Sequence, residues 1–125
     1  MEEKKLLLKK VSGEGLRANE GKVPMELVPT SLFFAVGEVL GAGAKKYAPR
    51  NWEKGMKWTT VYGCLLRHIS KWASPFHSDF DEETGYNHLW HAACNIAMLI
   101  EYENTCPELD DRVKYNKLET FEEGL

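Results

Sequence analysis

Residues 84–103 of the chain read TGYNHLWHAACNIAMLIEYE, and this stretch decides the fold class. At 100° per residue it forms a helix with two distinct sides. The first side carries His88, His91, Asn95 and Tyr102 together with Ala92, Met98 and Leu99. The second side is apolar and carries Leu89, Ala93, Ile96 and Ile100. Such a helix is expected to be buried over most of its surface, with its polar side chains satisfied by partners across an interface.

Two further helices are predicted upstream of this one. Thr30 or Ser31 can cap a helix that runs to about Ala42, and its apolar stripe is expected to face a core (Leu32, Phe33, Val36, Val39 and Leu40). The next helix runs from about Thr59 to Trp72, with one apolar face (Val61, Leu65, His68, Ile69 and Trp72). Because no alternating strand pattern extends beyond a few residues, we predict an all-α fold.

Length and charge limit the remaining possibilities. The 125 residues suffice for one domain, which we divide into an N-terminal arm (1–24), a helical domain (25–106) and a charged tail (107–125). A net charge of −3 argues against a nucleic-acid polymer as partner. The three leucines at 6–8 are too few for a membrane span, and three cysteines without C-x-x-C spacing fit a reducing cytoplasm.

The stretch between the first two helices, GAGAKKYAPRNWEKGMKW at 41–58, is predicted to be a loop because of its glycines and proline. It alternates cations with aromatic residues: Lys45, Lys46, Arg50, Lys54 and Lys57 with Tyr47, Trp52 and Trp58. Cations bind phosphate and aromatic faces stack on bases, which favours a nucleotide-binding loop. The alternative is a solvated loop whose tryptophans fill the core.

Four acids, Asp79, Asp81, Glu82 and Glu83, precede the third helix. The helix dipole accounts for one or two of them, but mutual repulsion opposes four unless a cation lies among them. Hard cations such as Mg²⁺ or Mn²⁺ take carboxylate ligands of this kind. A second interpretation makes His68, His88 and His91 the ligands of an HD-type metal phosphohydrolase, although a histidine in an apolar stripe is more often a core residue.

Several motifs occur in order along residues 21–102: GK at 21–22, ELVP at 26–29, GAKKYAPRNWEKG at 43–55, RHISKW at 67–72 and DEETGYNHLWHAACN at 81–95. Together they resemble the phage dATP/dGTP pyrophosphohydrolases of the MazZ type, which are similar to the MazG-like all-α nucleoside triphosphate pyrophosphatases. The resemblance implies a MazG-like helical bundle completed by oligomerisation, as a homodimer or homotetramer. It also implies hydrolysis of a purine deoxynucleoside triphosphate to the monophosphate and pyrophosphate.

The resemblance further implies roles for individual residues. Glu38, Asp81 and Glu83 would be catalytic and hold Mg²⁺ or Mn²⁺, with Asp79 as a further candidate metal ligand. The substrate would contact a larger set: Lys46, Tyr47, Arg50, Asn51, Trp52, Arg67, His68, His88, His91 and Asn95. MazG-like enzymes carry an E-x-x-E pair, but here the residues three before and three after Glu38 are Ala35 and Gly41. A nucleotide-binding protein without turnover is therefore an alternative on the same fold.

Overall fold

A computed structural model describes residues 15–18 and 20–114, and the described chain is built from helices. The three long helices are α2 (Thr30–Lys46), α3 (Trp58–Ala73) and α4 (His88–Thr105). Short 3-10 turns lie at η1 (Met25–Leu27), η2 (Asn51–Lys54) and η3 (Pro107–Leu109). No strand occurs in the part of the chain that is described, which confirms the all-α prediction. The outer parts of the predicted arm and tail, 1–14 and 115–125, lie outside the described residues.

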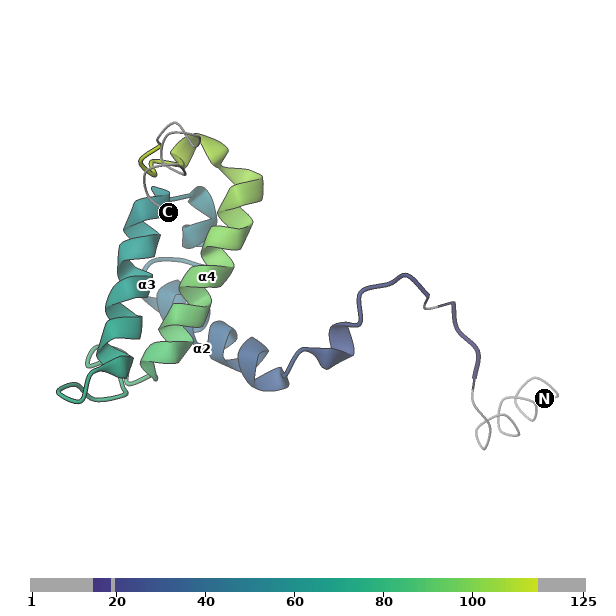
Figure 1. Cartoon of the computed structure of the whole chain (residues 1–125), viewed down its shortest axis with the longest axis horizontal. Helices are drawn as coiled ribbons and strands as arrows, with labels where there is room; N and C mark the ends of the chain where they lie inside the picture. The colour runs from purple at the N-terminus through teal and green to yellow at the C-terminus, as the bar shows by residue number, and fades with distance from the viewer. Residues whose placement is uncertain (1–14, 19, 115–125) are drawn as a thin grey trace, which may run out of the picture.

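Helices α3 and α4 form an antiparallel pair, and α2 packs against α4 (Figure 1). The core lies at the end of the pair where α3 begins and α4 ends. It consists of Trp58, Val61, Tyr102 and Cys106. Trp52, Met56, Met98, Leu99 and Leu109 pack around it. The loop before α3 and the segment after α4 therefore close over one end of the helix pair.

Two polar contacts fasten these closing segments. The Tyr102 hydroxyl donates to the backbone carbonyl of Trp52, which ties η2 to α4. The Asp111 carboxylate accepts the Thr59 backbone N–H at 2.9 Å and the Thr59 hydroxyl as well. Because Thr59 lies in the first turn of α3, Asp111 satisfies a backbone N–H group that the helix cannot satisfy itself. The first residues of the predicted tail are thus part of the fold.

The predicted helix boundaries need three corrections. α2 continues past Ala42 to Lys46, so Gly41 and Gly43 are helical and Lys46 belongs to the last turn. Pro29, and not Thr30 or Ser31, occupies the N-cap position of α2. α4 begins at His88 rather than near Thr84, because Gly85 has a φ of +76° and Asn87 caps the helix by accepting the Leu89 N–H at 2.8 Å.

The predicted burial is right for one side of α4 and wrong for the other. His88, Asn95 and Tyr102 are buried, as expected for the first side. The second side is exposed in the single chain (Leu89, Ile96 and Ile100), and so is the start of the α2 stripe (Leu32 and Phe33). With three long helices in the described chain, each can cover only part of its neighbours' apolar surface. None of the described helices combines the length and hydrophobicity needed to cross a lipid bilayer.

Candidate functional site

The acidic segment folds into a closed loop before α4. Phe80 and Asn87 form an isolated antiparallel bridge, and the Asp81 N–H donates to the Tyr86 carbonyl at 2.8 Å. The Gly85 N–H donates back to the Asp81 carbonyl at 2.8 Å, which requires the left-handed backbone of Gly85. The loop therefore has its own hydrogen-bonded frame, which holds Asp81 beside the first turn of α4.

The Asp81 carboxylate is oriented by this loop. Its Oδ2 atom accepts hydrogen bonds from the Glu83 N–H at 3.1 Å, the Thr84 N–H at 3.0 Å and the Thr84 hydroxyl at 3.1 Å. Burial pushes the pKa of Asp81 upward, but the hydrogen bonds from Thr84 and the nearby histidines outweigh it and lower the pKa. Asp81 is thus ionised at neutral pH, and no hydrogen bond among the described residues uses its Oδ1 atom.

Three histidines from α3 and α4 gather next to Asp81. The Nδ1 atoms of His68 and His88 share a hydrogen bond of 2.9 Å, in which one ring donates and the other accepts. The His91 ring stacks on His68 with centroids separated by 4.4 Å and planes inclined by 6°. Burial, and then the neighbouring His91, lower the pKa of His68 to about 4. Burial also lowers the pKa of His91. At neutral pH both of these rings are therefore neutral, the form in which imidazole binds a metal.

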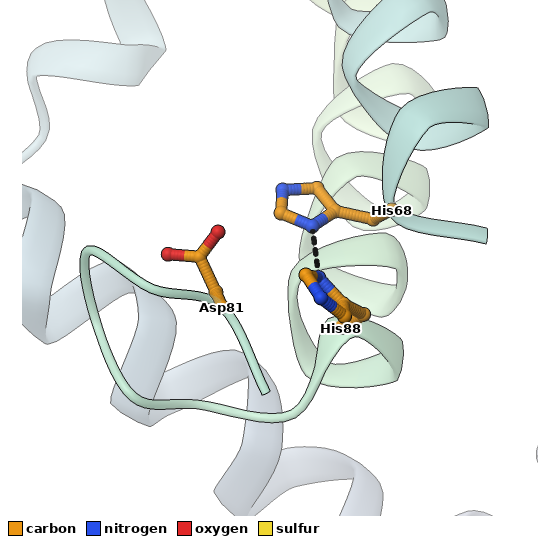
Figure 2. A group of neighbouring side chains, drawn as sticks. All are labelled: His68, Asp81 and His88. Atoms are coloured by element: carbon orange, nitrogen blue, oxygen red, sulfur yellow. Dashed lines mark hydrogen bonds between the residues drawn. The ribbon is translucent and has the colours of Figure 1, made fainter. Parts of the chain in front are cut away.

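One atom each from His68, Asp81 and His88 forms a group in which all three lie within 4.8 Å of one another (Figure 2). Within 15–18 and 20–114, it is the one grouping of three or more histidine, cysteine or carboxylate donors close enough to hold an ion. Two imidazole nitrogens and a carboxylate suit Mn²⁺ better than Mg²⁺, which prefers oxygen ligands. The donor set therefore fits one of the two predicted ions.

The three histidines of the HD-type interpretation lie close together, but His91 is not one of the three described donors that are close enough to hold one ion. Asp81 takes the third place, because the Nε2 atom of His91 faces the Thr84 hydroxyl at 2.7 Å. That same nitrogen lies 3.9 Å from Asp81 Oδ2. His91 is thus positioned to brace Thr84 and His68.

The other predicted acidic ligands lie outside this group. Glu38, half-buried on α2, accepts a hydrogen bond from the Tyr86 hydroxyl at 2.8 Å. Glu83 accepts a hydrogen bond from Lys46 Nζ at 2.7 Å. The Asp79 side chain is exposed and makes no side-chain hydrogen bond within the described chain, although its carbonyl accepts the His88 N–H. Their roles as metal ligands remain predictions.

The predicted nucleotide-binding loop lines a pocket of about 430 Å³. Arg50 has a φ of +62°, an uncommon backbone conformation for a residue with a side chain, and it pairs with Glu53. The walls are mostly apolar and come from the end of α2, the loop and one residue of α4: Val39, Leu40, Gly41, Gly43, Ala44, Tyr47, Ala48, Pro49, Arg50, Asn51, Trp52, Glu53, Met56 and Met98. Such a pocket can accept a flat apolar ring system with a polar edge.

The two tryptophans of this loop have different environments. Trp58 is 7% exposed and belongs to the core, as the core-filling alternative predicts. Trp52 packs on Tyr102 with ring centroids 6.1 Å apart and also lines the pocket. Trp52 therefore combines a structural contact with a place at the candidate binding surface.

Two further residues that were predicted to contact the substrate, Asn95 and Arg67, belong neither to the three-donor group nor to the lining of the pocket. Asn95 is buried on α4, and its amide nitrogen has no hydrogen-bond partner among the described residues. Arg67 is exposed on α3, one residue before His68. The structure thus gathers His68, His88 and His91 with Asp81, and it leaves Arg67 on the solvent side.

Sequence reasoning missed two residues that position the predicted ones. Thr84 bonds both Asp81 and His91, and Tyr86 bonds Glu38. A threonine three residues after an aspartate is a local signal for a side-chain-bonded turn, so Thr84 could have been found. No local pattern indicates the Tyr86 contact, which joins residues 48 positions apart.

The fold and the site define a small all-α domain with a histidine–aspartate cluster and a pocket lined by a cationic, aromatic loop. The chain belongs to the family described as dATP/dGTP diphosphohydrolase, N-terminal, which matches residues 12–112. It is 32% identical over 98 residues to a protein of Salmonella phage PMBT28 named dATP/dGTP diphosphohydrolase. That match covers 78% of this chain and 33% of the phage protein, so the chain spans about a third of that relative's length. No solved structure matches the chain.

Proposed function

We propose that the protein hydrolyses a purine deoxynucleoside triphosphate, dATP or dGTP, to the monophosphate and pyrophosphate with Mg²⁺ or Mn²⁺ as cofactor. The observation that carries the proposal is the contact between the two predicted functional loops. Lys46, at the end of α2 beside the pocket, lies 2.7 Å from Glu83 of the acidic loop. The name of the phage relative and the family description support the substrate class.

The base would enter the 430 Å³ pocket, where the Trp52 and Tyr47 side chains line the wall. Aromatic faces stack on bases without strong preference for one of them. The triphosphate would then extend toward Lys46 and the acidic loop. The Lys46–Glu83 pair is solvent-exposed, with side chains 54% and 69% accessible, so it is weak and can be exchanged for a phosphate.

The side chains around the triphosphate would divide the remaining work. Lys46 and Arg50 neutralise charge that accumulates on the departing pyrophosphate. Asp81, ionised and fixed by Thr84, holds its position beside the reacting phosphate, while Glu38 and Glu83 contribute further carboxylates. When bound, Mg²⁺ or Mn²⁺ supplies charge neutralisation and acidifies the attacking water.

We also propose that a second copy of this chain covers the exposed apolar faces. Leu89, Ile96 and Ile100 form one exposed stripe on α4, and Leu32 and Phe33 are exposed on α2. Contiguous apolar surface of this kind commonly marks a protein interface. A homodimer or homotetramer is the assembly that we expect. We expect it in the reducing cytoplasm, that of the host cell if the protein is phage-encoded, and the free Cys64, Cys94 and Cys106 are consistent with that compartment.

A direct assay tests the activity. The full chain is incubated with each dNTP and with Mg²⁺ or Mn²⁺, and nucleotide products and pyrophosphate are quantified. We expect dNMP and pyrophosphate from dATP and dGTP. Lys46→Ala should lower kcat/KM by roughly 10- to 100-fold, the value of one charged hydrogen bond. Lys45→Ala is the matched control, because Lys45 is exposed on the same turn and forms no ion pair in the described chain.

Two results would count against the proposal. Absence of pyrophosphate with every nucleotide and metal refutes it, and nucleotide binding without turnover then supports the sequestering alternative. Equal losses in Lys45→Ala and Lys46→Ala would refute the proposed contact between Lys46 and the triphosphate.

A further inference from the structure

We propose that the metal centre is formed by His68, Asp81 and His88, and that it takes a divalent first-row transition ion in preference to Mg²⁺. The proposal deepens the proposed function by assigning the metal to His68, Asp81 and His88 in place of Glu38 and Glu83. Its consequence for catalysis rests on the proposed function. Metal binding itself can be measured without nucleotide, so the two proposals can fail independently.

The first argument is the distance between the two histidine nitrogens. Two nitrogens that each lie about 2.1 Å from one metal, at right angles to each other, are about 3.0 Å apart. The Nδ1 atoms of His68 and His88 are 2.9 Å apart and form a hydrogen bond in which one ring donates to the other. An ion that took the place of the shared proton would therefore find the two rings already at the spacing of adjacent ligands.

The second argument is the state of the Asp81 carboxylate. Three hydrogen bonds from its own loop fix Oδ2, and no described residue donates to Oδ1. The side chain is only 17% exposed. A carboxylate that is oriented through one oxygen and available through the other has the arrangement of a supported metal ligand.

The third argument is the origin of the three ligands. His68 comes from α3, Asp81 from the acidic loop and His88 from the first turn of α4 (Figure 2). His91 stacks on His68 and holds Thr84, which in turn holds Asp81. Two of the three ligands thus have a supporting contact that does not involve the metal.

The fourth argument is what the alternative ligands do. Glu38 accepts a hydrogen bond from Tyr86, and Glu83 accepts one from Lys46. Neither belongs to a group of three donors in the described chain. Imidazole nitrogen favours transition ions, with affinity rising from Mn²⁺ through Co²⁺ to Ni²⁺, whereas Mg²⁺ prefers oxygen alone.

Co²⁺ is the probe for the test, because its binding is measured by calorimetry and by the visible absorption that nitrogen ligands produce. The full chain is titrated without nucleotide. We expect binding with a visible band, and a dissociation constant weakened at least about 100-fold in His68→Gln, His88→Gln and Asp81→Asn. Excess Mg²⁺ should not displace the ion.

His77→Gln is the matched histidine control, because His77 is exposed and its hydrogen bonds within the described chain are to Ser74. It should bind Co²⁺ like the wild type, and so should Glu38→Gln and Glu83→Gln. His88 is 3% exposed, so its variant can fail to fold. Circular dichroism shows whether each variant is folded. If the His88 variant is not, the variants of the half-buried His68 and Asp81 decide the test.

The proposal is overturned if the wild type does not bind Co²⁺, or if His68→Gln and Asp81→Asn bind it unchanged. Loss of binding in the two glutamate variants, with retention in the histidine variants, would instead assign the metal to the all-carboxylate set. Failure of dNTP hydrolysis with any metal would refute the proposed function and leave the Co²⁺ result standing.

Discussion

Replacing Thr84 with valine tests whether the acidic loop is held in place by its threonine hydroxyl. Valine has nearly the same shape, so the substitution removes polar contacts while filling the same space. The lost contacts are the hydrogen bond to Asp81 Oδ2 at 3.1 Å and the contact with His91 Nε2 at 2.7 Å. The Tyr86 N–H also loses its acceptor, but at 3.3 Å this hydrogen bond is long and contributes little to stability.

The magnitude follows from the burial of the two main partners. The side chains of His91 and Asp81 are 15% and 17% exposed, so water replaces the lost bonds only in part. At about 1 kcal/mol for each of two bonds, Thr84→Val should lower the free energy of unfolding by about 2 kcal/mol. For a domain of this size each kcal/mol shifts Tm by roughly 4 °C, so Tm should fall by roughly 8 °C.

Urea and thermal unfolding, followed by circular dichroism at the helical band, measure this change. Thr60→Val is the control, since Thr60 is exposed and its hydroxyl makes no hydrogen bond within the described chain. If Thr84→Val stays within 0.5 kcal/mol of the wild type, about the usual range for a surface substitution, the hydroxyl does not hold the loop. The same variant should weaken Co²⁺ binding by roughly 10- to 100-fold, as a positioning residue would.

Four further predictions concern the stability of the fold. Gly55→Ala should destabilise by about 1–3 kcal/mol in urea unfolding, because φ is +96° and the new Cβ would lie 2.8 Å from Leu109 Cδ1. Gly37→Ala, in an open helical position, should instead stabilise by up to about 1 kcal/mol. Asn87→Ala should remove the α4 cap and cost about 1 kcal/mol, whereas Asn87→Ser should retain most of it. Hydrogen bonds at the start of α3 lower the pKa of Asp111 below its ordinary value of 3.8, so this stabilisation is present above that pH and is lost as the pH falls through the lower folded value. Urea midpoints measured between pH 5 and pH 2 should show a steeper decline for the wild type than for Asp111→Asn.

Helix type and approximate position followed from sequence periodicity, but the limits of two helices did not. Gly43 disfavours a helix by about 1 kcal/mol and is followed by Pro49 and Gly55, which predicted an end at Ala42. The contact of α2 with α4 keeps the helix intact to Lys46. In contrast, the start of α4 at His88 could have been predicted from the sequence, because Gly85 and the capping Asn87 are both local signals.

Contacts between distant segments could not be predicted from the sequence. Lys46 meets Glu83 across 37 residues, and Thr59 meets Asp111 across 52. Each residue type was visible in the sequence, but the partner depends on how the three helices pack. The resemblance selected Asp81 and Glu83 together, whereas the structure gives one to the histidine cluster and the other to Lys46.

The four acids before α4 illustrate why a charge cluster in sequence is a poor guide to a metal site. Their repulsion was the reason to expect one cation among them, yet the structure gives Asp81 and Glu83 different partners. Asp79 is exposed, Glu83 lies against Lys46, and only Asp81 turns toward the histidines. What distinguishes Asp81 is the following Thr84 and Gly85, which build the turn that orients its carboxylate. The informative pattern is therefore an aspartate whose own loop supplies its hydrogen-bond donors and which lies beside the buried His88 and the half-buried His68.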